Sequence, residues 1–577
     1  MVESHRTMAH LVAGVALACG ASAASAQTLL DPRLRVSVWA SGFSSNPTTF
    51  TWIGPGEMLV LQKHNGRVRW VKDGVILGDA LDLPVNIDQE RGGLGIVADP
   101  DFATNGFVYI YYSKSTTGGD TNVNASWLDN RVERYTWNGA TLGNAFGPLV
   151  AFPADPNQGN GPNHDGGVLR FGPDGKLYGQ TGDLNRGRFG GKERVEQNTA
   201  TSGSASVGGI FRINADGTIP PDNPFTGESD AALHLWWSYG LRNGFGMSFD
   251  PVTGELWNTE NGSSSYDEVC RVPKGMNSGW LKIMGPDARD ATYFENGFAA
   301  FDASDLVHLA NSTYVDPAFS FKVPVGITAI GFLTSKLFPH DLQDRCLFAD
   351  NNLKNLYAAP LDGARAEFVL PPSLADRVAD DATERDLLRL GTNFGVVTDL
   401  QLGADGYLYL MDHTGMRVLQ VRPVTDELDP AAWRLEPGAR TDGASEAAEA
   451  SDDVAWEVSD GVITRRPRPL RIGAEFALNA ANPLALVAQV ETRSIGPGVP
   501  QQIEAWNVAT QRFETVDVAV LGRDDVARTV ALDPALHLDP VTRAVKLRLS
   551  VLPLPGSRQP PRLAVRIDLL RLDVTYP

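Results

Sequence analysis

The chain has 577 residues, which is too long for one ordinary domain and excludes a small disulfide-stabilised module. Hydrophobic residues make up 42% of the chain and charged residues 21%, as in folded globular proteins, so global disorder is excluded. The formal net charge of −19 repels phosphate backbones and anionic lipid headgroups, which argues against nucleic acid and membrane surfaces as partners. Ca²⁺ and neutral substrates such as sugars suit an acidic chain.

The first 26 residues have the pattern of a secretory signal peptide. Arg6 and His10 precede an apolar stretch from Leu11 to Cys19, and small residues follow up to Ala26, where we predict cleavage. Neither this stretch nor any later segment reaches the about 20 apolar residues that span a bilayer. We therefore expect a periplasmic or secreted protein without a membrane span.

The cysteines leave two interpretations open. Cys19 lies in the predicted signal peptide, so Cys270 and Cys346 remain in the mature chain. In an oxidising compartment these two residues can form a disulfide, and two separate buried thiols are the alternative.

Residues 27–424 have the pattern of a repetitive all-β structure. Helical periodicity is nearly absent, and short β-branched and aromatic runs alternate with turns rich in Gly, Pro, Asp and Asn. Six segments share a turn that leads into an apolar strand: residues 54–61, 99–109, 172–178, 250–257, a degenerate copy at 344–349, and 404–410. Six such units predict a six-bladed β-propeller, and the early strand 34–39 is expected to complete the last blade.

The composition changes after Pro423. Residues 425–455 are acidic and rich in Ala and Ser, which predicts a linker. Within residues 456–577, apolar and polar residues alternate strictly, as in 545–551 and 570–576, and this pattern predicts a β-sandwich. No cluster of catalytic residue types stands out there, so we expect an accessory function such as attachment, ligand binding or structural support.

A histidine in a glycine-rich loop is the first candidate for chemistry. His164 lies in the segment 159–167, where glycines allow a ligand to approach closely and imidazole titrates near neutral pH. Asp183 ends the neighbouring strand of the same predicted hairpin, so its carboxylate can orient a general base at His164. The alternative is that His164 caps one turn and Asp183 begins another.

A second group of candidates follows in the segment 240–268. Gly262 and Ser263 lie in a tight loop that exposes backbone carbonyls, and Asp267 and Glu268 add the hard oxygen ligands that Ca²⁺ prefers. A solvated turn is the alternative for these two acidic residues.

Arg242 and Asn243 precede this loop beside glycine-rich turns. A guanidinium in that setting suits a bidentate carboxylate or a quinone oxygen, and a surface pair is the alternative.

The remaining histidines and motifs carry less information. His64, His340 and His413 lie alone in turn-like settings and are expected to be structural. The sequence has no serine nucleophile elbow and no phosphate-binding glycine loop, which argues against an esterase or a nucleotide-dependent enzyme.

Several motifs in series resemble one known family. They are residues 89–95 with 99–106, 163–167 with 172–175 and 181–183, 213–225, 240–243, and 260–262 with 267–268. Over roughly residues 30–425 the chain resembles the glucose/sorbosone dehydrogenase family, which are soluble aldose dehydrogenases dependent on pyrroloquinoline quinone. The resemblance implies the same six-bladed propeller.

The resemblance also implies a mechanism. His164 would take the proton from the C1 hydroxyl of the sugar while hydride passes to the quinone, and Asp183 would support His164. The carbonyls of Gly262 and Ser263 would hold the Ca²⁺ that polarises the quinone, and Asp267 and Glu268 match a second, structural Ca²⁺ site.

The residues that the resemblance places at the cofactor are only partly kept. Glu90, Arg242 and Asn243 match cofactor positions. The basic residue that the family places before one strand is replaced by Asn352, and Lys354, two positions away, is the candidate for binding the cofactor in its place. Val396 and Thr398 stand where the family has two arginines, which pair with the cofactor carboxylates.

The leading hypothesis from the sequence is therefore a quinone-dependent dehydrogenase with a sugar substrate and a separate electron acceptor. Two other hypotheses remain: a non-catalytic propeller that binds carbohydrate or protein, and a Ca²⁺-dependent propeller lactonase.

Overall fold

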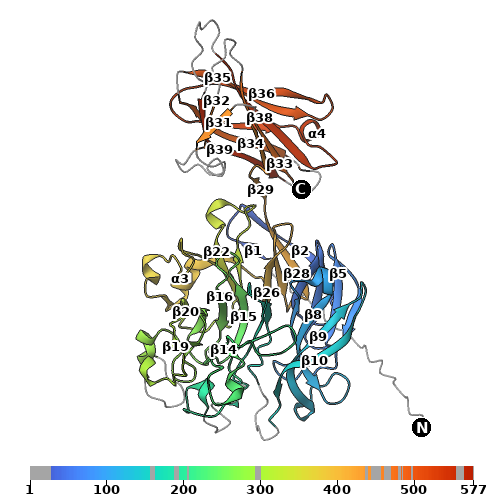
Figure 1. Cartoon of the computed structure of the whole chain (residues 1–577), viewed down its shortest axis with the longest axis vertical. Coiled ribbons are helices and arrows are strands. Elements are labelled where there is room, and N and C mark those ends of the chain that lie inside the picture. Colours follow the sequence, from blue (N-terminus) through green and yellow to red (C-terminus); the bar gives the residue numbers. More distant parts are fainter. Residues whose placement is uncertain are drawn as a thin grey trace, which may run out of the picture.

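The computed structural model describes residues 27–155, 163–186, 194–204, 207–292, 301–435, 439–442, 456–460, 469–478, 483, 485–495, 498–553 and 564–575. The predicted signal peptide, residues 1–26, lies outside them. None of the helices within these ranges is both long and apolar enough to cross a membrane. Figure 1 shows a propeller with a smaller β-sandwich above it.

Six sheets of the described residues form the blades of the propeller, and the first four strands of each blade are antiparallel neighbours. The first blade comprises β3 (Pro47–Gly54), β4 (Glu57–Gln62), β5 (Arg67–Lys72) and β6 (Val75–Asp82), and the second comprises β7 (Gly93–Ala98), β8 (Phe107–Ser115), β9 (Trp127–Trp137) and β10 (Leu142–Pro153). The third comprises β11 (Leu169–Phe171), β12 (Leu177–Thr181), β13 (Gly209–Ile213) and β14 (Trp236–Tyr239), and it is extended by β18 (Met276–Asn277) and β19 (Thr313–Tyr314).

The other three blades complete the ring. The fourth blade comprises β15 (Gly244–Phe249), β16 (Leu256–Glu260), β17 (Asp267–Arg271), β20 (Phe319–Phe321) and β24 (Val378–Ala379). The fifth comprises β21 (Ile327–Leu333), β22 (Arg345–Asp350), β23 (Leu356–Pro360), β25 (Arg389–Thr392) and β1 (Thr28–Leu29). The sixth comprises β26 (Val397–Leu402), β27 (Leu408–Asp412), β28 (Arg417–Pro423) and β2 (Leu34–Ser41). Two short helices, α1 (Phe102–Asn105) and α3 (Ala382–Arg385), lie in the connections.

The first strands of the blades line the centre of the ring. β3 contacts β7, the contacts continue through β11, β15 and β21 to β26, and β26 contacts β3 again. Each repeated turn of the sequence joins the first strand of a blade to its second strand, because the turn residues fall between those strands in all six blades. The predicted six-bladed propeller is confirmed.

The ring closes as the sequence predicts. β2, from the start of the chain, pairs antiparallel with β28, so the last blade combines one N-terminal strand with three C-terminal strands. Figure 1 shows β2 and β28 side by side. This arrangement locks the two ends of the propeller together, and it brings loops that are far apart in the sequence to neighbouring blades.

Hydrophobic cores fill the spaces between neighbouring blades. Tyr111 of β8, Phe152 of β10 and Phe211 of β13 belong to one such cluster, together with the fully buried Trp236 of β14. The β-branched and aromatic runs form strands because both faces of each blade pack against another blade. Burial of one such side chain contributes about 1.5–3 kcal/mol, so these clusters hold the blades rigidly around the axis.

The C-terminal part is a sandwich of two sheets among the described residues. One sheet comprises β31 (Ala439–Asp442), β32 (Trp456–Asp460), β39 (Ala564–Thr575), β34 (Ala485–Ser494) and β37 (Val526–Leu532), with β29 (Thr425–Leu428) paired to β39. The other comprises β30 (Ala432–Leu435), β33 (Leu470–Ala477), β38 (Ala544–Val551), β35 (Val499–Asn507) and β36 (Arg512–Leu521). The helix α4 (Pro534–His537) precedes β38.

The structure differs from the predicted linker over residues 425–455. β29, β30 and β31 lie in that segment and pair with β39, β33 and β32, so the sandwich begins at Thr425, directly after the last blade. The acidic composition misled the prediction, because these strands lie at or near sheet edges, where one face is open to water and tolerates charge.

The two cysteines within the described residues are free and buried. Cys270 lies on β17 and Cys346 on β22, and burial raises the pKa of both thiols well above the ordinary value. Ellman's reagent should therefore leave both thiols of the native protein unmodified and react with both after unfolding in guanidinium without reductant. A disulfide would contradict this expectation, because the unfolded chain would then react only after reduction.

Candidate functional site

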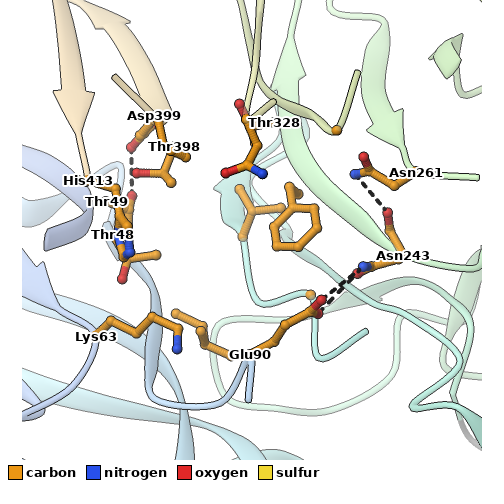
Figure 2. A pocket seen from close by; sticks show the side chains of 17 residues that line it. Thr48, Thr49, Lys63, Glu90, Asn243, Asn261, Thr328, Thr398, Asp399 and His413 are labelled. Atoms are coloured by element: carbon orange, nitrogen blue, oxygen red, sulfur yellow. Dashed lines mark hydrogen bonds between the residues drawn. The ribbon is translucent and has the colours of Figure 1, made fainter. Parts of the chain in front are cut away.

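One end of the propeller contains a cavity of about 380 Å³. All six blades line it, with residues at the beginning of the first strand or just after the second strand (Figure 2). The polar and charged lining residues are Thr48, Thr49, Lys63, Glu90, Asn243, Asn261, Thr328, Asn351, Thr398, Asp399 and His413. Because the repeated turns lie at the opposite ends of these strands, they define the other face of the ring.

His164 and Asp183 form a buried hydrogen-bonded pair next to this cavity: neither is a lining residue, but the lining residue Glu90 accepts a hydrogen bond from the N–H of His164. His164 precedes β11 and Asp183 follows β12, so the hairpin brings both residues to the same end of the blade. His164 Nδ1 lies 2.6 Å from Asp183 Oδ1. The other carboxylate oxygen accepts a 2.9 Å hydrogen bond from Trp280 Nε1, and the backbone N–H of Asn185 donates to Oδ1 at 2.8 Å.

The electrostatics of the pair keep Asp183 ionised. Burial opposes its ionisation, but the charge and hydrogen bond of His164 and the charge of Arg242 outweigh it and lower the pKa of Asp183. An ionised carboxylate can only accept, so Nδ1 of His164 carries a proton, and when the ring is neutral Nε2 keeps its lone pair. Within the described chain no group hydrogen-bonds to Nε2, which leaves it able to take a proton from a ligand.

The backbone of His164 is held in an unusual conformation. Its φ is 68°, in the left-handed region that non-glycine residues seldom adopt. The N–H of His164 donates a 2.7 Å hydrogen bond to Glu90 Oε2, which stabilises this conformation. Gly182 makes room for it, because a Cβ there would lie 2.5 Å from the carbonyl oxygen of His164.

Glu90 and Asn243 lie together on one side of the cavity (Figure 2). Asn243 Nδ2 lies 3.5 Å from both carboxylate oxygens of Glu90, a weak contact. Asn243 Oδ1 is buried and has no hydrogen-bond partner among the described residues. A buried acceptor without a partner is costly, so this atom indicates that a polar ligand belongs here.

Arg242 lies under the cavity and holds the neighbouring loop. Its Nη1 donates to the carbonyl oxygens of Asn261 at 2.8 Å and Gly262 at 3.0 Å, and its guanidinium lies 5.4 Å from the centre of the Trp280 ring. Its backbone N–H and the hydroxyl of Ser278 both donate to Glu260, whose pKa is raised by burial.

Asp267 organises the same loop. Its Oδ1 accepts from the N–H of Gly262 at 3.0 Å, and its Oδ2 accepts from the N–H groups of Val325, Gly326 and Ile327 at 2.8, 2.5 and 3.2 Å. Burial raises the pKa of Asp267 to about 6 against the opposing effect of these donors. The carboxylate that matches a structural Ca²⁺ ligand is thus already bonded to four backbone groups.

Glu268 is buried next to Asp267 on β17. Its Oε1 accepts a 2.5 Å hydrogen bond from the N–H of Gly285, and its Oε2 lies 3.5 Å from Cys270 Sγ. Burial and the charge of Glu260 raise its pKa well above the ordinary value. In the part of the chain that the structure describes, no three His, Cys, Asp or Glu side chains converge on one metal position.

The comparison with known proteins agrees with this geometry. The profile of the Glucose / Sorbosone dehydrogenase family matches residues 44–419, which is more than half of the chain. The chain belongs to this family. The resemblance predicted from the sequence motifs is confirmed, and the matched region ends within the last blade, before the sandwich.

Three relatives and one solved structure are similar to the chain. An uncharacterized protein of Synechocystis is 34% identical over 251 residues, 41% of this chain and 56% of that protein. Aldose sugar dehydrogenase YliI of Escherichia coli is 28% identical over 339 residues, which are 58% of this chain and 78% of that protein. Quinoprotein glucose dehydrogenase B of Acinetobacter calcoaceticus is 27% identical over 325 residues, which are 51% of this chain and 65% of that protein. A solved glucose dehydrogenase shares the fold with TM-score 0.51 and 22% identity, over 67% of this chain and 98% of that one.

Of the positions at which the sequence predicts a departure from the glucose/sorbosone dehydrogenase family, two line the cavity and one does not. Val396 and Thr398 line it, so the positions without arginine do face the site. Lys354 and Asn352 do not line it; the Lys354 ammonium hydrogen-bonds to the carbonyl of Asn351. Arg242 does not line it either, because its guanidinium is bonded to the loop carbonyls below.

Sequence reasoning missed several residues of the site. Lys63 follows β4 and lines the cavity, and His413, expected to be structural, lines it as well. Trp280 was not predicted to orient Asp183. The available signal was positional: each second strand of a blade ends at this face, so the first polar residue after it is a candidate lining residue.

Proposed function

We propose that the protein is a quinone-dependent sugar dehydrogenase that oxidises the C1 hydroxyl of an aldose to a lactone, with pyrroloquinoline quinone as the hydride acceptor. The observation that carries this proposal is the 2.6 Å contact between His164 Nδ1 and Asp183 Oδ1 beside a cavity of about 380 Å³. Membership of the family and the similarity to a quinoprotein glucose dehydrogenase support it.

The roles of the chain's own residues follow from their contacts. His164 takes the hydroxyl proton at Nε2, because Nδ1 is bonded to Asp183. The ionised Asp183 stabilises the imidazolium that forms and keeps the ring in the productive tautomer. Trp280 and Asn185 hold the Asp183 carboxylate in place, so the base is positioned before the substrate arrives.

The lining residues fit a flat, polar cofactor. Lys63, Asn243 and Thr398 line the cavity with polar groups, and Asn243 Oδ1 and Thr398 Oγ1 are buried without partners among the described residues. When bound, the quinone supplies the two-electron acceptor for hydride. Glu90 lies on the same side as His164, where it contacts the His164 N–H and borders the space for the sugar.

The loop of Gly262 and Ser263 is the proposed place of Ca²⁺, which would supply a Lewis acid. Three fully buried carboxylates, Glu260, Asp267 and Glu268, surround this loop, and the guanidinium of Arg242 is bonded to its carbonyls. A divalent cation bound by loop carbonyls would stabilise the ionised form of these acids, whose pKa values burial raises.

The remaining parts of the hypothesis are proposals of the same kind. We place the mature protein in the periplasm or outside the cell, with a separate electron acceptor that reoxidises the quinone. The β-sandwich has an accessory function. Neither nucleic acid nor a membrane surface is a partner, given the net charge of −19.

Reconstitution of the purified protein tests the proposed function. With Ca²⁺ and pyrroloquinoline quinone, we expect aldose-dependent reduction of a redox dye, and no reduction when either the quinone or the sugar is omitted. A non-catalytic sugar-binding propeller would bind the aldose without dye reduction, and a lactonase would consume a lactone without quinone. Either result would reject the dehydrogenase.

A further inference from the structure

Among the described residues that line the cavity, Lys63 carries the one ammonium, and its surroundings leave it available to a ligand. Lys63 Nζ donates to the carbonyl oxygen of Gln89 at 3.0 Å and lies 3.1 Å from His64 Nε2. Burial and the charge of Lys63 lower the pKa of His64 to about 4, so at neutral pH this nitrogen accepts the bond. Lys63 makes no ion pair with any described residue, and the third N–H of its ammonium has no acceptor among them.

A hydroxyl without a partner belongs to the same side of the cavity. Thr398 Oγ1 is buried and makes no hydrogen bond to any described residue. Figure 2 shows Thr398 and Lys63 on the side of the cavity away from Asn243. Asp399, next to Thr398, does not compete for the ligand, since Arg170 lies 2.6 Å from its Oδ1 and Thr49 donates to its Oδ2 at 2.6 Å.

A chain of hydrogen bonds connects the backbone segments that carry Lys63 and Thr398 across the closure of the ring. The N–H of Lys63 donates to the carbonyl of Asn46, and Asn46 Nδ2 donates to the carbonyl of His413 at 2.9 Å. The N–H of His413 donates to the carbonyl of Val396 at 2.8 Å, and its Nδ1 bonds the carbonyl of Pro47 at 3.0 Å. His413 therefore joins the first blade to the last.

We propose that Lys63 and Thr398 form a carboxylate-binding subsite of the cavity, which takes the place of the arginines absent at positions 396 and 398. An ammonium and a hydroxyl that lack acceptors can each bind a carboxylate oxygen of a ligand in the cavity, and a desolvated cavity strengthens that interaction. Glu90 and Asn243 lie opposite, so the cavity has an anion-binding side and a side for the sugar hydroxyls. The assignment of the quinone as the natural ligand rests on the proposed function.

The test uses two probes on the full-length mature protein, with binding measured by isothermal titration calorimetry. Pyrroloquinoline quinone is the proposed cofactor, and isophthalate is an aromatic dicarboxylate without a quinone. Lys63→Met, which keeps the side-chain length, should weaken both probes by about 10- to 100-fold, as expected for one charged hydrogen bond in a desolvated site. Thr398→Val should weaken them by about 3- to 10-fold.

Two further variants control the interpretation. Lys274→Met removes an exposed lysine far from the cavity lining and should leave both affinities unchanged. Thr398→Arg in the Lys63→Met background restores a cation at the same subsite and should recover the lost affinity to within about threefold. Circular dichroism and thermal melting of each variant show whether it is folded.

Each outcome decides between the two proposals. If isophthalate binds and depends on Lys63 while the quinone does not bind, the subsite stands and the quinone-dependent function fails. If the quinone binds equally well to the wild type and to Lys63→Met, the subsite is overturned and the proposed function survives. If neither probe binds to the wild type, both proposals are rejected.

Discussion

His164→Ala should lower kcat of the reconstituted enzyme by about 10²–10⁴-fold, the usual contribution of a positioned general base. The reason is that Nε2 of His164 is the lone-pair nitrogen of a ring whose other nitrogen is 2.6 Å from the Asp183 carboxylate. Steady-state dye reduction at saturating sugar measures the change.

The affinity for the cofactor provides the internal control. His164 does not belong to the proposed carboxylate subsite, so quinone binding measured by calorimetry should change by less than about threefold, which is about 0.7 kcal/mol. His308→Ala, at an exposed histidine, should keep full activity. A His164→Ala enzyme with unchanged kcat would show that another residue removes the proton.

Asp183→Asn separates the base from its orientation. The amide keeps the size of the side chain, but its N–H₂ can face His164 Nδ1 and favour the tautomer with the proton on Nε2, which cannot act as a base. We expect Asp183→Asn to lower kcat, as His164→Ala does. The double variant with both substitutions should lose no more kcat than His164→Ala alone, because the two residues act as one unit.

The fold was predictable where local pattern and global architecture agree. Each blade has the same turn between its first and second strands, so six copies of that turn predict six blades, and the alternation in residues 34–41 predicts the closing strand. The error over residues 425–455 has the opposite cause. β29 and β31 have four residues each, too short to show alternation, and β39, the partner of β29, lies far along the chain.

The site was predictable only within single hairpins. His164 and Asp183 flank one hairpin, so their contact follows from the antiparallel register. Lys63 and Thr398 belong to the first and last blades, and only the closed ring brings them to one cavity. Contacts of Arg242 and Asp267 with backbone groups also escaped prediction, because an oxygen or N–H partner in a loop leaves no trace in the residue types.

The role of Asp267 can be separated from that of a metal ligand by its stability effect. Asp267→Ala removes the acceptor of the N–H groups of Gly262, Val325, Gly326 and Ile327, and it leaves buried donors without partners. We expect a loss of about 3–5 kcal/mol in the free energy of unfolding, as for the removal of one partner from a buried charged network. Urea unfolding followed by fluorescence measures this loss.

The presence of Ca²⁺ then decides between the two roles. If Asp267 anchors the loop through its backbone contacts, the loss is the same in excess Ca²⁺ and in excess EGTA, because the four donors do not depend on a cation. If Asp267 instead binds Ca²⁺, the wild type loses the stabilisation by the bound ion in EGTA. The difference in the free energy of unfolding between the wild type and Asp267→Ala would then be smaller in EGTA than in Ca²⁺. Asp101→Asn, at an exposed carboxylate, serves as the control and should leave stability unchanged within about 0.5 kcal/mol. Because Gly326 lines the cavity, the anchor role also predicts weaker quinone binding in the Asp267→Ala variant under both conditions.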